Sequence, residues 1–175
     1  MRVTLTPDQV AAATGCPQRN VAAHWPNLTA ALAEFGIDSL AVEVAAAATV
    51  AIETSAFLPI RERRADPKKQ PKLWARQERY WPSGYFGRGF IQLTWRGNYL
   101  EAGEALGLDL VGMPELALDS TVAARVLALY FKAHGIPAAA ETGDWKRVRR
   151  LVNGGLTDYD RFLCAVQALQ ECTCA

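Results

Sequence analysis

Glu53 is the residue whose type and position most directly suggest chemistry. It follows an apolar run, Ala48-Thr49-Val50-Ala51-Ile52, near the end of a predicted helix. Apolar neighbours remove water from a carboxylate, which disfavours its charged form and raises its pKa. A carboxyl group that keeps its proton near neutral pH is suited to act as a general acid. The ordinary alternative is a helix-end glutamate that points into water, although the helix dipole disfavours a negative charge there.

Two further glutamates are candidates for a partner carboxylate. Hydrolysis of a glycosidic bond by the usual route requires a second acidic side chain. Glu62 lies nine residues after Glu53, and Glu78 lies within Arg76-Gln77-Glu78-Arg79. Both have arginine neighbours, which keep a carboxylate ionised as a general base requires. On spacing alone, a surface salt bridge is the more common role for either residue.

A glycine-rich stretch leads into a short alternating segment. Gly84, Gly87 and Gly89 precede the run Phe90-Ile91-Gln92-Leu93-Thr94. The stretch lacks the lysine and the following helix of a phosphate loop, so the glycines favour a tight turn where a backbone or ligand approaches. The alternation predicts a strand with Gln92 and Thr94 on its polar, cleft-facing side. Nearby aromatic residues either stack on sugar rings or, more commonly, fill cores; they are Trp81, Tyr85, Phe86, Trp95 and Tyr99.

Helical patterns cover most of the remaining chain. Residues 56–86 lack helical periodicity and contain four prolines, so we expect a long irregular excursion there. No linker or repeat interrupts the chain, and we expect one mainly α domain over residues 1–175. The predicted helices cover residues 7–13, 25–34, 40–54, 94–106, 120–134 and 145–152, with a last helix that Thr157 caps.

The charge is unevenly distributed along a nearly neutral chain. The formal net charge is +1, which argues against nucleic-acid binding through bulk charge. Residues 61–79 nevertheless carry eight basic and three acidic side chains. This basic segment is either a solvated face or a surface that attracts an anionic polymer such as bacterial cell wall.

The cysteines and the N-terminus set expectations about compartment. Cys16, Cys164, Cys172 and Cys174 do not form the spaced framework of a disulfide-stapled domain, so we expect free thiols. Met1-Arg2-Val3-Thr4 is not followed by the apolar core of a signal peptide, and no apolar run is long enough to span a membrane. We therefore expect a monomer made in the cytoplasm, without membrane insertion, that reaches an outside substrate only after release.

Taken together, these motifs resemble glycoside hydrolase family 19, which includes plant-type chitinases and many phage endolysins. The most specific match is the run from Tyr85 to Thr94 followed by Asn98-Tyr99, where the family reads roughly Y-x-G-R-G-x-I-Q-L-S/T and then N-Y. Pro114-Glu115-Leu116 and Asn153-Gly154-Gly155 look like two later family passages. The N-terminal part looks like the endolysin branch, and the resemblance covers about residues 5–170.

The resemblance implies roles for individual residues. The family's catalytic acid falls on Glu53, and the second carboxylate falls on Glu62 by the endolysin pattern or on Glu78 by the plant pattern. We favour Glu62, since the rest of the chain is endolysin-like. Thr94 matches the hydroxyl residue that helps hold the attacking water. The positions that match the substrate cleft or its motif are Tyr85, Arg88, Gln92, Asn98 and Asn153. The family's histidine before the acid is Ile52 in this chain, and its Gly-Gly after the acid is Ser55-Ala56.

The resemblance also implies a fold and a reaction. The fold is the lysozyme-like one, a bilobal, mainly α domain with a small β element beside the active-site cleft. The reaction is hydrolysis of a β-1,4-linked polysaccharide by an inverting mechanism with two carboxylates, which needs no metal and no cofactor. We expect peptidoglycan as the substrate. The alternatives are a chitinase that acts on chitin oligomers, a catalytically inactive glycan-binding relative, and a protein-interaction module that uses residues 61–79.

Overall fold

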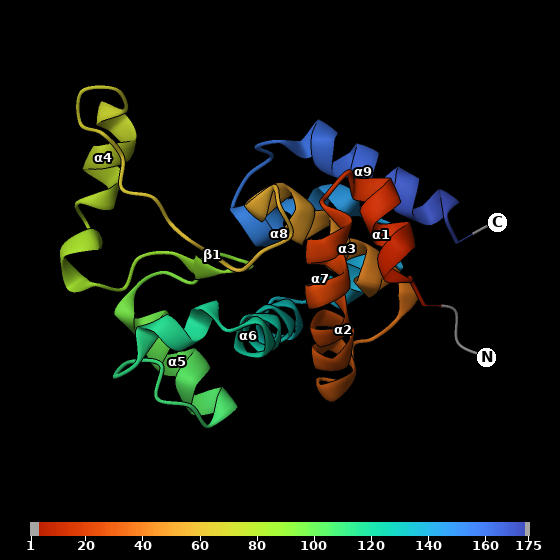
Figure 1. Ribbon diagram of the computed structural model, residues 1–175, viewed down its shortest axis with the longest axis horizontal. Helices are drawn as coiled ribbons and strands as arrows, with labels where there is room; N and C mark the ends of the chain where they lie inside the picture. The colour runs from red at the N-terminus through yellow and green to blue at the C-terminus, as the bar shows by residue number, and fades with distance from the viewer. Residues whose placement is uncertain (1–3, 174–175) are drawn as a thin grey trace.

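The protein consists of a helical body from which residues 62–86 project as an arm (Figure 1). The computed structural model describes residues 4–173. The body's helices are α1 (Pro7–Thr14), α2 (Gln18–Glu34), α3 (Leu40–Thr54), α6 (Ser120–Ala133), α7 (Ile136–Glu141), α8 (Trp145–Asn153) and α9 (Tyr159–Glu171).

Helix α3 is the buried centre of the body. Ser39 caps it, because its side chain accepts a hydrogen bond from the Val42 N–H. Residues 42–51 of the helix are all buried, and the helix packs against α1, α2, α7, α8 and α9. Its many alanines let these neighbours approach closely. The last turn of α3, which carries Glu53, is therefore held by packing on several sides.

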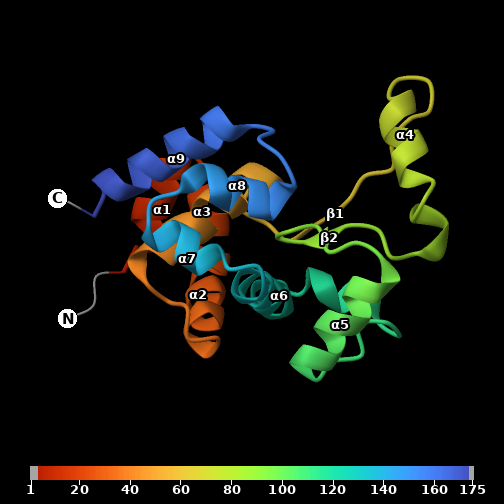
Figure 2. The ribbon, with the colours of Figure 1, turned by 180° about the vertical axis from the view of Figure 1, so that it is seen from behind.

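A second, smaller apolar cluster forms around helix α5 (Arg96–Leu106) and the 3-10 turn η2 (Pro114–Leu118). Helix α6 joins the two clusters, since Leu127 and Phe131 belong to the main core and Val126 belongs to the smaller one. Figure 2 shows α6 between the body and α5. The predicted mainly α, bilobal architecture is confirmed.

The β structure is shorter than the sequence predicts and lies earlier. Strands β1 (Ile60–Arg61) and β2 (Arg88–Gly89) pair antiparallel, with Ile60 opposite Gly89. The predicted strand over residues 90–94 is wrong, because the chain turns back and Leu93 bridges to Arg88. Gln92 has a φ of 55°, which an extended strand does not allow. The strand pair closes the base of the arm.

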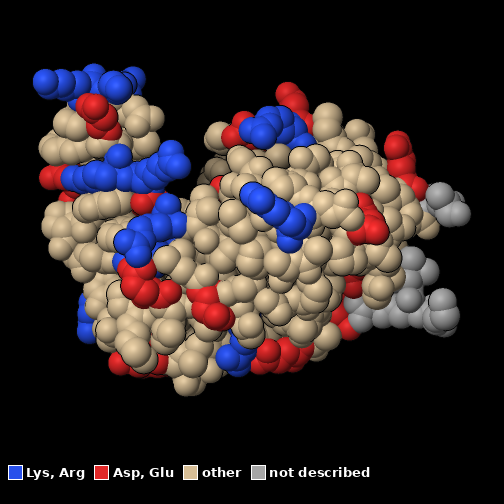
Figure 3. All heavy atoms as spheres, viewed as in Figure 1, with Lys and Arg blue, Asp and Glu red and all other residues tan. Residues whose placement is uncertain are grey.

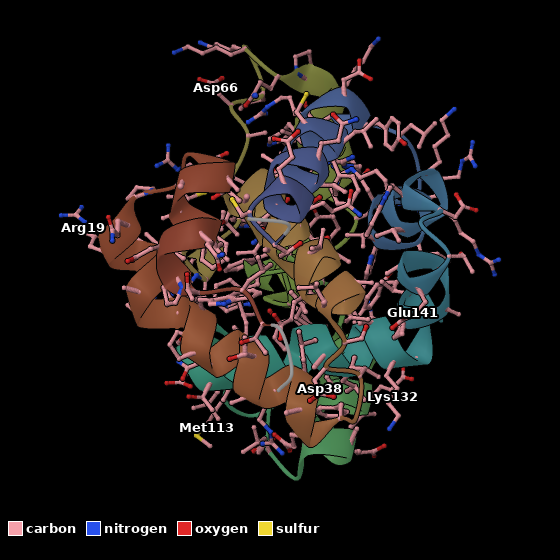
Figure 4. All side chains as sticks on the ribbon, turned by 90° about the vertical axis from the view of Figure 1, so that its right-hand side faces the viewer. Arg19, Asp38, Asp66, Met113, Lys132 and Glu141 are labelled. Carbon is pink, nitrogen blue, oxygen red and sulfur yellow. The ribbon has the colours of Figure 1, made fainter. Side chains whose placement is uncertain are left out.

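The arm is more ordered than the predicted irregular excursion. It contains α4 (Pro71–Gln77) and the 3-10 turn η1 (Trp81–Ser83), each with a proline in its first turn. The Arg64 guanidinium lies 5.6 Å from the Trp74 ring centroid and 5.0 Å from that of Trp81. Asp66, labelled in Figure 4, lies in the loop at the outer end of the arm. Cation–π contacts and proline-started turns thus replace a conventional core in this segment.

The helices differ from the predictions at four other places. Helix α2 begins at Gln18 rather than Trp25 and accommodates Pro26 in its interior. Helix α7 was not predicted, because Pro137 reads as a stop after α6 but instead occupies the first turn of a short helix. The Thr157 cap is wrong, since Asp158 is the N-cap of α9 and makes no side-chain cap bond. Helix α5 begins at Arg96, two residues after the predicted start.

The prediction of free thiols is confirmed for the three cysteines that the structure describes. Cys16, Cys164 and Cys172 are free. Cys174 lies outside the described residues. Residues 1–3, which belong to the N-terminal segment expected not to be a signal peptide, also lie outside them. Within residues 4–173, the helices are all too short or too polar to cross a membrane.

Candidate active site

Glu53 lies at the C-terminal end of α3 and is bound through one of its two carboxylate oxygens. Its Oε1 accepts a hydrogen bond from Arg149 Nη1 at 2.5 Å and a longer one from Asn153 Nδ2 at 3.4 Å. Among the described residues, Oε2 has no hydrogen-bond donor. The side chain is 21% exposed, so Oε2 is accessible to a molecule outside the body. The expectation of a carboxylate partly desolvated by apolar neighbours omits its main contact, because a cation lies against this carboxylate.

Arg149 is the main residue of the site that sequence reasoning missed. It lies on α8, 96 residues from Glu53, and is 1% exposed. Its Nε donates to the Thr157 carbonyl at 2.9 Å. The guanidinium thus ties Glu53 to the loop after α8, which begins with Gly154-Gly155.

Glu62 lies at the foot of the arm, directly after β1, and is surrounded by hydrogen-bond donors. Tyr80 Oη donates to Oε1 at 2.6 Å, and Gln77 Nε2 donates to the same oxygen at 2.9 Å. The Gly87 N–H donates to Oε2 at 3.0 Å. Three donors on one carboxylate hold it in a fixed orientation, which suits a group that must position a water molecule. Tyr80 and Gln77 were not predicted as site residues, although Gln77 adjoins Glu78 in the chain.

Glu78 has a different environment from Glu62. It forms an ion pair with Arg64 on the arm, and its side chain is 40% exposed. This is the surface salt bridge that the sequence offers as the common alternative.

The two lobes place Glu53 and Glu62 on different structural units. Figure 3 shows a notch between the arm and the helical body. Helices α3 and α8 belong to the body, whereas Glu62 and its donors Gln77 and Tyr80 belong to the arm. The two carboxylates thus come from the two units that border the notch.

Gly87 lies so close to Glu62 that no side chain fits. A Cβ at this position would lie 3.2 Å from Glu62 Cβ and 2.7 Å from Gln92 Oε1. The predicted role of this glycine, close approach in a tight turn, agrees with this geometry.

We expect Gly87→Ala to reduce the hydrolysis that the family resemblance implies by about tenfold or more, because the added methyl displaces the side chains of Glu62 and Gln92 and small misplacements are costly in catalysis. The free energy of unfolding should fall by about 1–3 kcal/mol from overpacking. Gly97→Ala is the matched control, since nothing lies within 4 Å of a Cβ there. Equal loss of activity in both variants would contradict this role for Gly87.

Three predicted cleft residues converge on one pocket of about 510 Å³ between α5, α6 and residues 91–94. Gln92, Thr94 and Asn98 line it, and α6 adds Tyr130 and His134, which the sequence did not single out. Thr94 Oγ1 donates to the Gln92 carbonyl at 2.8 Å, which leaves its lone pairs free to accept. Neither Glu53 nor Glu62 is among the described residues that line this pocket.

Arg88 and Tyr85 make contacts inside the protein. Arg88 is 3% exposed and binds Glu115 through Nε and Nη2, at 3.0 and 2.8 Å. Its Nη1 donates to the Gly84 and Phe86 carbonyls and to Tyr99 Oη. Tyr85 Oη donates to the Val111 carbonyl at 3.1 Å. These contacts fix the Gly-Arg-Gly turn, and direct contact of either residue with substrate stays a prediction.

Burial, together with the hydrogen bond to Glu62 and the charge of Glu62, raises the pKa of Tyr80 to about 12. The raised pKa adds stability below pH 10, and this contribution is lost as the pH rises from 10 to 12. We expect the unfolding free energy of wild type, relative to Tyr80→Phe, to decrease between pH 9 and pH 11.5. Denaturant titrations at both pH values measure this difference, and a difference independent of pH would contradict the coupling.

Comparison with known proteins gives the family. Residues 39–146 match the model of glycoside hydrolase family 19, described as chitinase class I. Chitinase 8 of Oryza sativa subsp. japonica is 36% identical over 92 residues, which cover 41% of this chain and 35% of that protein. Inactive chitinase-like protein 1 of Hevea brasiliensis is 47% identical over 47 residues, 27% of this chain and 15% of that protein. The chain thus spans about a third or less of these relatives.

The fold is similar to that of chitinase C from Streptomyces griseus HUT6037. The two structures superpose with a TM-score of 0.68 over 94% of this chain and 92% of that one, at 24% sequence identity. The family model covers more than half of the chain and includes the region of both carboxylates. The chain belongs to glycoside hydrolase family 19.

Proposed function

We propose that the protein hydrolyses β-1,4 glycosidic bonds in a polymer that contains N-acetylglucosamine, with inversion at the anomeric carbon. The observation that carries this proposal is the pair of differently held carboxylates. Glu53, on the body, has one accessible oxygen, and Glu62, on the arm, is fixed by three donors. Glu53 thus offers a free oxygen to a leaving group, and Glu62 is oriented to position a water molecule, so the two carboxyl groups are held for different tasks.

In the proposed reaction Glu53 is the acid. Glu53 forms an ion pair with Arg149 in the free protein, so it takes up a proton from water on Oε2 when the chain binds, and transfers it to the glycosidic oxygen as the bond from that oxygen to the anomeric carbon breaks. Arg149 holds Oε1, which orients the carboxyl group toward the notch, and it stabilises the carboxylate that remains after the proton has left. The body supplies this half of the site.

Glu62 is the base in the same reaction. A water molecule on the opposite face of the sugar attacks the anomeric carbon and gives its proton to Glu62. Thr94 assists by accepting a hydrogen bond from this water. Inverting enzymes hold their two carboxyl groups about 6.5–9.5 Å apart, which leaves space for the water.

We expect Glu62→Gln to lower the rate about 10²–10⁴-fold, since a positioned base contributes this much. Glu78→Gln should change the rate less than about twofold, because Glu78 forms an exposed ion pair with Arg64. Release of reducing ends from a soluble substrate measures both rates. The reverse ranking would assign the base to Glu78.

Peptidoglycan is the substrate that the charge of the arm supports. Arg61 pairs with Glu115 and Arg64 with Glu78. The other six basic side chains of residues 61–79 have no ion-pair partner among the described residues; they are Arg63, Lys68, Lys69, Lys72, Arg76 and Arg79. Figure 3 shows Lys and Arg side chains on the arm, along one side of the notch. A cationic wall of this kind attracts an anionic polymer.

Chitin is the second candidate, because the names of the matched relatives favour it. Parallel assays with purified peptidoglycan and with colloidal chitin distinguish the two. We expect faster release of reducing ends from peptidoglycan, and loss of turbidity of chloroform-permeabilised Gram-negative cells. Activity on chitin alone would establish the chitinase. Binding of either polymer without cleavage would instead establish an inactive relative, as the name of one match describes.

A further inference from the structure

We propose that the indole face of Trp95 stacks on a pyranose ring of the bound chain, next to the Glu62 side of the site; this inference rests on the proposed function. Trp95 is 43% exposed. The exposed large apolar side chains of the described residues are Trp95, Leu100, Met113 and Leu156, and Trp95 is the aromatic one. A single exposed apolar side chain is ordinary, so the inference rests on where this ring lies relative to Glu62 and on its backbone.

The backbone at Trp95 is unusual for a bulky residue. Its φ is 75° and its ψ is 136°, outside the small left-handed region that L-residues sometimes adopt. Three residues earlier, Gln92 also has a positive φ of 55°. Residues held in such conformations occur preferentially at binding sites, where the surroundings enforce them. Here the Trp95 N–H donates to the Tyr85 carbonyl at 2.8 Å, which contributes to fixing the chain.

The ring lies beside the proposed base. The Trp95 and Tyr80 ring centroids are 5.1 Å apart with their planes at 64°, an edge-to-face contact. Tyr80 Oη is the same group that donates to Glu62 Oε1 at 2.6 Å. The residue before Trp95 is Thr94, which lines the pocket. A single side chain, that of Tyr80, therefore separates the exposed indole from Glu62, the carboxylate that would activate water.

The other tryptophans do not offer an equivalent surface. Trp25 is buried, and Trp145 packs against the main core. Trp74 lies beneath the Arg64 guanidinium, and Trp81 stacks on Phe86 with centroids 4.3 Å apart. The contact with Tyr80 leaves the indole of Trp95 43% exposed.

The chemistry of a β-1,4-linked sugar fits this surface. One face of the pyranose ring presents several C–H bonds, and the face of an aromatic ring carries partial negative charge that attracts them. Stacking of this kind orients a ring without using its hydroxyl groups. A ring seated on Trp95 would set the position of the chain relative to Glu62 and Thr94.

The test combines Trp95→Gly and Trp95→Phe with Glu53→Gln, so that binding is measured without cleavage. The ligand is the β-1,4-linked tetramer of N-acetylglucosamine, followed by calorimetry and by tryptophan fluorescence. We expect Trp95→Gly to weaken binding about tenfold and Trp95→Phe about threefold at most. Glycine tolerates the positive φ, so the melting temperature of Trp95→Gly should not fall, which separates binding from a structural role. Leu100→Ala, on an equally exposed apolar residue, is the control and should bind normally.

The outcomes separate this inference from the proposed function. Tetramer binding should shift the emission of Glu53→Gln, and the shift should disappear in Trp95→Phe. Unchanged affinity and an unchanged shift in both Trp95 variants would overturn the inference, while hydrolysis by wild type would still stand. A Trp95-dependent shift without cleavage by wild type would support the inference and reject the hydrolase. Failure of Glu53→Gln to bind the tetramer would overturn the inference, and the peptidoglycan assay would then test the proposed function on its own.

Discussion

Glu53→Gln is expected to lower the rate of reducing-end release about 10²–10⁴-fold, the contribution of a positioned general acid. Glutamine keeps the shape of the side chain and can still accept the hydrogen bond from Arg149 at Oε1. It has no acidic proton to give to the leaving oxygen. The comparison uses initial rates on the same peptidoglycan preparation.

The control for this variant is an exposed glutamate outside the site. Glu104 is exposed on α5 and does not line the pocket, so Glu104→Gln should retain full activity. Circular dichroism must show that Glu53→Gln is folded. A folded Glu53→Gln variant with the activity of wild type would remove Glu53 from the chemistry.

Arg149→Met is expected to have the largest effect on stability, a loss of about 3 kcal/mol. This is the low end of the range for breaking a buried ion pair, because Arg149 is 1% exposed but Glu53 is 21% exposed and keeps some water. The substitution also removes the donor to the Thr157 carbonyl. Denaturant unfolding monitored by circular dichroism measures the loss.

Two variants make this prediction specific. Arg150→Met changes the exposed neighbour on the same helix and should alter stability by less than about 0.5 kcal/mol. Arg149→Lys should recover only part of the loss. The planar guanidinium of arginine donates to Glu53 and to the Thr157 carbonyl at once, and the single ammonium group of lysine does not reproduce both contacts. If Arg149→Met and Arg150→Met unfold at the same denaturant concentration, the ion pair does not contribute to the fold.

The sequence predicted the residues whose roles are set by local patterns. The Ser39 cap and the run of alanines located α3, and hence the helix end at which Glu53 lies. The glycine spacing before Phe90 indicated a close approach, and the structure shows that Gly87 contacts Glu62. Gln92, Thr94 and Asn98 are all predicted as site residues from one motif, and they line one pocket.

The residues that the sequence did not reveal act through long-range contacts. Arg149 binds Glu53 across 96 residues, and no local pattern distinguishes it from Arg147 or Arg150 on the same helix. Tyr80 and Gln77 reach Glu62 because the arm folds back on itself around Arg64. The alternation of apolar residues also led to the wrong prediction of a strand over residues 90–94. Alternation carries no information about backbone angles, and Gln92 has a positive φ that a strand does not allow.

The most direct test of the acid–base pair is a crystal structure of Glu53→Gln with the β-1,4-linked tetramer of N-acetylglucosamine. We expect a glycosidic oxygen within hydrogen-bond reach, about 2.6–3.2 Å, of the amide at residue 53. A water molecule should lie between the anomeric carbon and Glu62 on the opposite face of the same sugar. A tetramer bound away from residue 53, or one with Glu62 on the same face as residue 53, would contradict the account.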